Sequence, residues 1–195
     1  HLDSLLDKKV FKQTHLISGS SGGMIGAAYY RELQLQKQNG QLKNTYVNRN
    51  HVNIMAKDLL NPIAFYMATN DFFIRTKKYN YNGHTYTKDR GYAFEKQLLI
   101  NTENAFDKKL IDYRKPEFKA QIPIMILSPT IINDGRRLLI SSQPISYLSN
   151  NNPHNNTFSQ PNTENVEFSN LFKNQGADDL KYSSALRMSA TFPYI

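Results

Sequence analysis

The feature that most constrains this sequence is a glycine-rich run at residues 19–23 (GSSGG), which separates an apolar segment from a helical pattern. Residues 14–18 (THLIS) form a short, mostly apolar run that is typical of a buried strand. Residues 24–38 contain helix formers throughout, and Asn39-Gly40 follows them as a candidate helix end. The sequence therefore predicts a strand, a tight turn and a helix in succession.

The glycine-rich run matches the pattern G-x-S-x-G, with Ser21 as its central serine. Between a strand and a helix, this pattern holds a serine nucleophile on a strained turn that exposes its hydroxyl. We expect Gly19 and Gly23 to be required, because a side chain at either place would collide with neighbouring backbone. The positive end of the helix would point at Ser21, and the N–H of Gly22 would help to hold an oxyanion.

Two other interpretations of this run remain open at the level of sequence. It could be a flexible Gly/Ser loop, or a loop that binds phosphate at a helix N-terminus. The second interpretation lacks the Lys-Ser/Thr of the Walker motif and the third glycine of the dinucleotide fingerprint. Because the sequence contains no cysteine, a thiol nucleophile is excluded for this stretch, which leaves Ser21 as the candidate.

The rest of the chain alternates helical patterns with short apolar runs. Helices are predicted within residues 51–70, 89–110 and 179–190, a hairpin at 79–87, strands at 122–127 and 137–140, and an exposed loop at 150–165. This alternation predicts an α/β layered fold.

Three ordered blocks of the sequence resemble the patatin-like phospholipase family. They are residues 17–27 (ISGSSGGMIGA), residues 122–130 (IPIMILSPT) with Asp134-Gly135-Arg136 after them, and residues 184–193 (SALRMSATFP). The resemblance implies a three-layer α/β/α hydrolase fold and a serine lipid acyl hydrolase. It also implies a Ser–Asp dyad, in which Ser21 attacks the acyl carbonyl and forms an acyl-enzyme that water releases.

The resemblance places two further parts outside the chain. The glycine-rich oxyanion loop would precede His1, and the Asp-Gly-Gly/Ala motif that carries the dyad aspartate would follow Ile195. We therefore expect residues 1–195 to be the central part of a single catalytic domain, with little activity as an isolated piece. Asp134 is the alternative base within the chain, although it lies where the family has a turn.

Other acidic and basic side chains are weighed for the same chemistry. Asp178 and Asp179 are interpreted as charges at a helix start. His15, just before the turn, is expected to be a packed or hydrogen-bonded core residue. A Ser21–Asp134–His154 triad is conceivable in chain order, but nothing in the sequence fixes His154. The spacing of His, Asp and Glu predicts no metal site, and we expect no cofactor.

The charge pattern bears on partners. The chain has 24 Lys+Arg against 16 Asp+Glu, a net charge of +8, but the basic residues are scattered and form no nucleic-acid motif. The expected partner is a phospholipid or another acyl-ester lipid, with contact at a membrane surface and no nucleic acid. No stretch is apolar enough for a membrane span, so we expect a soluble or membrane-peripheral protein.

Two other functions stay open. One is an acyltransferase on a related fold, and the other is a basic module that binds membrane surfaces. Apolar and aromatic residues at positions 59–73 would line an acyl-chain pocket, form a lid that contacts membrane, or simply belong to the core. They are Leu59, Leu60, Ile63, Phe65, Tyr66, Met67, Phe72 and Phe73.

Overall fold

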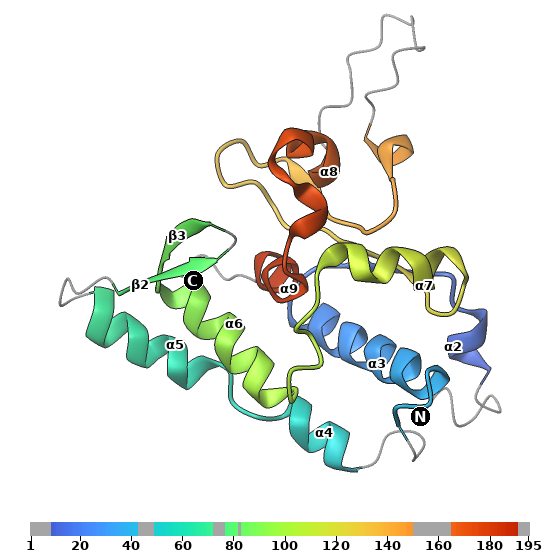
Figure 1. The fold of residues 1–195 in the computed structure, drawn as a ribbon, viewed down its shortest axis with the longest axis horizontal. Coiled ribbons are helices and arrows are strands. Elements are labelled where there is room, and N and C mark those ends of the chain that lie inside the picture. Colours follow the sequence, from blue (N-terminus) through green and yellow to red (C-terminus); the bar gives the residue numbers. More distant parts are fainter. Residues whose placement is uncertain (1–8, 43–48, 72–76, 82, 150–164, 191–195) are drawn as a thin grey trace, which may run out of the picture.

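The structure, a computed structural model, describes residues 9–42, 49–71, 77–81, 83–149 and 165–190 (Figure 1). After α2 (Val10–Gln13), its central unit consists of β1 (Leu16–Gly19), α3 (Gly22–Gln38) and β4 (Ile124–Leu127). β1 and β4 pair in parallel along their whole length. The predicted strand, turn and helix are confirmed, and so is the mixed α/β class.

The segment between α3 and β4 is mostly helical. It contains α4 (Arg49–Met55), α5 (Leu60–Tyr66), η1 (Met67–Asp71), β2 (Lys78–Tyr81), β3 (His84–Thr87), α6 (Arg90–Asn101), η2 (Leu110–Tyr113) and α7 (Arg114–Phe118). β2 and β3 form the predicted antiparallel hairpin, in which Gly83 has φ 78°, as a tight turn requires. The helix predicted for residues 89–110 ends earlier, at Asn101.

The segment after β4 returns to the central unit. It contains β5 (Arg137–Leu139), η3 (Ser146–Leu148), β6 (Asn165–Glu167), α8 (Phe168–Leu171), η4 (Lys173–Gln175), η5 (Ala177–Asp179) and α9 (Tyr182–Ala190). Antiparallel bridges join Leu127 to Ile140 and Thr130 to Arg137, so residues 137–140 are the hairpin partner that the sequence suggests. β5 and β6 pair in parallel. The predicted loop at 150–165 lies outside the described residues, apart from Asn165 in β6.

Helix α9 lies between α3 and α6 and contacts both of them (Figure 1). Its apolar face is buried, with Ala185 and Leu186 fully inaccessible to solvent. Leu98 of α6 and Leu127 of β4 belong to the same apolar core. This packing joins the three blocks that were singled out in the sequence, because α3, β4 and α9 each carry one of them.

A buried polar network ties these elements together. The Arg31 guanidinium is ion-paired with Glu117, and it donates to the Pro123 carbonyl at 3.0 Å and to the Tyr182 hydroxyl at 3.1 Å. It also lies over the Tyr113 ring, 4.6 Å from its centroid. Arg31 and Glu117 are almost completely buried, so each charge depends on the other for compensation.

The neighbouring residue Glu32 extends this network. Its carboxylate accepts hydrogen bonds from the Tyr113 hydroxyl at 2.8 Å and from the Lys108 ammonium at 2.5 Å. Burial raises the pKa of Tyr113 well above its ordinary value, and the nearby Tyr182 and Glu32 raise it further. The middle of α3 is therefore held in the core by charged and hydrogen-bonded groups.

The structure corrects one expectation about an individual residue and adds to another. His15 is exposed rather than packed in the core, since β1 is only partly covered and Leu16 is 52% exposed. Asp178 and Asp179 lie in the first turn of η5, as the sequence indicates. They form ion pairs with Arg114 and Lys109, each at 2.6 Å, and so attach the segment before α9 to η2 and α7.

Candidate active site

Ser21 occupies the turn between β1 and α3 in an unusual backbone conformation. Its φ is 69° and its ψ is −171°, a region that residues with a side chain rarely adopt. A serine at a helix N-terminus ordinarily turns its hydroxyl back onto the first helical N–H groups, but the Ser21 side chain makes no such hydrogen bond. The residue is exposed, so its hydroxyl is accessible from solvent.

Two backbone hydrogen bonds hold this conformation. The N–H of Ser21 donates to the carbonyl of Ser189 on α9 at 2.7 Å, and the Ser21 carbonyl accepts from Met24 at 3.0 Å. A third bond, from the N–H of Ser128 to the Gly19 carbonyl at 3.0 Å, attaches the end of β4 to the same turn. All three sequence blocks therefore meet at Ser21.

The glycines around Ser21 have different roles. A Cβ at Gly19 would lie 3.1 Å from Sδ of Met24, so it would meet a flexible side chain rather than the neighbouring backbone that was expected. At Gly22 and Gly23, a Cβ would meet no atom of the described residues within 4 Å. No described residue would therefore collide with a side chain at Gly23, contrary to the expectation that this position requires glycine. The first turn of α3 still leaves the N–H groups of Gly22 and Gly23 without helical carbonyl partners.

Asp134 lies in an exposed turn and is hydrogen-bonded to Arg136, two residues later in the same turn. Its carboxylate accepts from the backbone N–H of Arg136 at 3.0 Å and from Nε of the same residue at 2.7 Å. These hydrogen bonds lower the pKa of Asp134. A carboxylate that is paired within its own turn is a poor general base, so the geometry gives no support to Asp134 in that role.

None of the histidines that the structure describes forms a hydrogen bond with Ser21. His51 on α4 contacts the Tyr29 hydroxyl at 3.0 Å, and His84 lies on β3. His154 lies outside the described residues, so the structure does not test the triad that would include it. Within the described ranges, no group of three or more His, Asp or Glu residues is placed to hold a metal ion.

One site residue escaped sequence reasoning. Ser189 is buried, and its hydroxyl has no hydrogen-bond partner among the described residues, while its carbonyl holds the N–H of Ser21. The signal was present, because Ser189 belongs to the third block, but its contact with a turn 168 positions earlier (189 − 21) is not visible in the sequence.

A cavity of about 300 Å³ opens beside the turn. Gly22 and Ile25 of α3 line it together with Ile54, Leu59 and Leu98. The apolar residues at 59–73 divide among the alternatives that the sequence leaves open. Leu59 lines this cavity and Ile63 is buried in the core, whereas Leu60, Phe65 and Met67 are exposed. Phe72 and Phe73 lie outside the described residues.

Comparison with known proteins gives no relative: no family model, no curated protein and no solved structure matches the chain. No helix in the described part of the chain is both long and apolar enough to cross a membrane.

Proposed function

We propose that this chain forms the nucleophile-bearing part of a serine lipid acyl hydrolase of the patatin-like type. The observation that carries the proposal is the geometry of Ser21, which combines a positive φ with an exposed, uncapped hydroxyl at the start of a 17-residue helix. Strain of this kind persists only where the surroundings impose it, and it is concentrated at functional sites. The resemblance in three sequence blocks supplies the lipid ester as the substrate class.

In the proposed reaction, the Ser21 hydroxyl attacks the acyl carbonyl carbon of the lipid and loses its proton to a base. The N–H of Gly22 stabilises the negative charge that develops on the carbonyl oxygen, an interaction worth about 3–4 kcal/mol per donor in known hydrolases. The alcohol part of the lipid leaves with a proton, and water then releases the fatty acid from the acyl-enzyme. The resemblance implies that the base is the aspartate of an Asp-Gly-Gly/Ala motif.

The proposal is tested by hydrolysis of phospholipid vesicles with the full-length protein. We expect fatty acid release to be lost in Ser21→Ala and retained in Ser20→Ala, a matched control at the neighbouring exposed serine. Equal release by both variants would exclude Ser21 as the nucleophile. If an acyl acceptor other than water collects the acyl group, the protein is an acyltransferase that uses the same turn.

A further inference from the structure

One side of α3 borders two cavities, although Tyr29 on that side is buried in the core. Met24, Ala28, Arg31 and Leu35 are buried on one side of the helix. Residues 22, 26, 29, 33 and 37 recur at helical spacing on another side, where they line two cavities. We call the cavity of about 300 Å³ beside Ser21 the elbow cavity and the second one, of about 240 Å³, the distal cavity.

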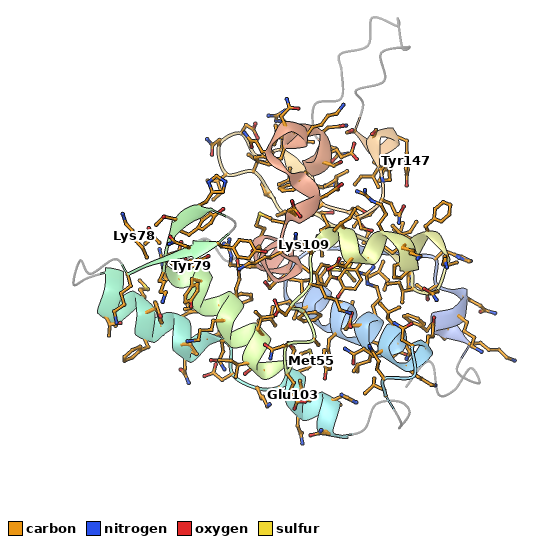
Figure 2. All side chains as sticks on the ribbon, in the orientation of Figure 1. Met55, Lys78, Tyr79, Glu103, Lys109 and Tyr147 are labelled. Carbon is orange, nitrogen blue, oxygen red and sulfur yellow. The ribbon has the colours of Figure 1, made fainter. Side chains whose placement is uncertain are left out.

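The two cavities adjoin each other. Gly26 of α3 and Met55 of α4 line both of them. A Cβ at Gly26 would meet no described atom within 4 Å, so this position leaves the space open. Met55 lies at the end of α4, close to the end of α6 (Figure 2). The two residues thus mark the place where one cavity passes into the other.

Most of the lining of this groove is apolar in both cavities. Lys57 and Asn101 add polar groups to the elbow cavity, and Lys37 and His51 add them to the distal cavity. Ile25, Ile54 and Leu98 line the elbow cavity, and Leu33, Leu42 and Val52 line the distal cavity. From Gly22 to Leu33 the groove follows α3 for ~16 Å, at 1.5 Å per residue. A long, mostly apolar groove that begins at Gly22, the residue after the exposed Ser21, fits a flexible hydrocarbon chain better than a compact polar ligand.

From this arrangement we infer that the groove along α3 binds the acyl chain of the substrate, and that Gly26 and Met55 determine the chain length accepted. The inference rests on the proposed function of Ser21. The ester carbonyl lies at Ser21, the first methylenes occupy the elbow cavity, and longer chains pass Gly26 into the distal cavity. Short chains use the elbow cavity alone.

The test places a ring in the passage with Gly26→Phe in the full-length protein. We expect kcat/KM for long-chain p-nitrophenyl esters to fall at least about tenfold relative to short-chain esters, since each methylene withdrawn from an apolar site weakens binding roughly fourfold. The control is Ile100→Phe, at a position of α6 that is 56% exposed and lines neither cavity. Met55→Ala added to Gly26→Phe should restore part of the long-chain activity.

A binding measurement gives a readout that does not require turnover. A fluorescent long-chain fatty acid should bind to Ser21→Ala and bind more weakly when Gly26→Phe is added. Thermal unfolding of each variant establishes that it is folded. An unchanged chain-length profile and unchanged fatty acid binding in Gly26→Phe would overturn the inference that the groove binds the acyl chain.

Failure of the groove can be separated from failure of the proposed function. A fluorophosphonate probe that labels Ser21 in both Gly26→Phe and the parent, with identical chain-length profiles, refutes the groove and leaves the nucleophile intact. Absence of labelling in the parent refutes the proposed function, and with it the assignment of the groove to a substrate.

Discussion

Replacing Ser21 by glycine should stabilise the fold while it removes the nucleophile. Ser21 has φ 69° and ψ −171°, a conformation that costs a residue with a side chain about 1–3 kcal/mol. Glycine adopts it without that cost, but it also gives the unfolded chain more freedom, which offsets about 0.4–1 kcal/mol. We therefore expect the free energy of unfolding of Ser21→Gly to rise by about 1 kcal/mol.

Ser21→Ala is the matched comparison, because it keeps the Cβ and loses only a hydroxyl that caps nothing. Its stability should lie within about 0.5 kcal/mol of the parent. Urea unfolding followed by circular dichroism measures both variants, and the melting temperature of Ser21→Gly should rise by about 2–4 °C. If Ser21→Gly were less stable than Ser21→Ala, the claim that the backbone at Ser21 is strained would be refuted.

Three further perturbations test the packing around the turn. Arg31→Met leaves the buried Glu117 carboxylate without its charged partner and should lower the free energy of unfolding by about 3–5 kcal/mol in urea unfolding. Adding Glu117→Leu should recover part of this loss. A double variant whose loss equals the sum of the two single losses would contradict the pairing. Burial raises the pKa of Tyr113 and of Tyr182, so the fold favours their neutral forms. Their contribution to the free energy of unfolding should be constant below about pH 10 and fall above it by up to about 1.4 kcal/mol per pH unit per tyrosine. Urea midpoints that do not change with alkaline pH would contradict this. Gly19→Ala brings a methyl group to 3.1 Å from the sulfur of Met24, a flexible side chain that needs to move by only a few tenths of an ångström. The free energy of unfolding should fall by less than about 1 kcal/mol in urea unfolding, and a larger loss would show that Met24 cannot move.

The parts of the fold that could be predicted are those encoded locally. The apolar run before residues 19–23 and the helix formers after them were sufficient to predict β1 and α3, because turn chemistry and helix propensity act over a few residues. The tight hairpin at Gly83 was predictable for the same reason. Ser21 could be singled out because its motif requires only five consecutive residues.

Contacts between distant segments could not be predicted in this way. Nothing near Arg31 in the sequence signals that it is buried against Glu117, which lies 86 positions later. Likewise, the exposure of His15 depends on how far β1 is covered, and the groove along α3 depends on where Met55 of α4 comes to lie. These features follow from tertiary packing, which overrides the local pattern.

The most direct test of the central claim is to react the full-length protein with a fluorophosphonate probe and to locate the adduct by peptide mass spectrometry. The account predicts an adduct on the Ser21 hydroxyl that is absent from Ser21→Ala and present in Ser20→Ala. An adduct on another serine, or labelling that survives Ser21→Ala, would contradict the assignment of Ser21 as the nucleophile.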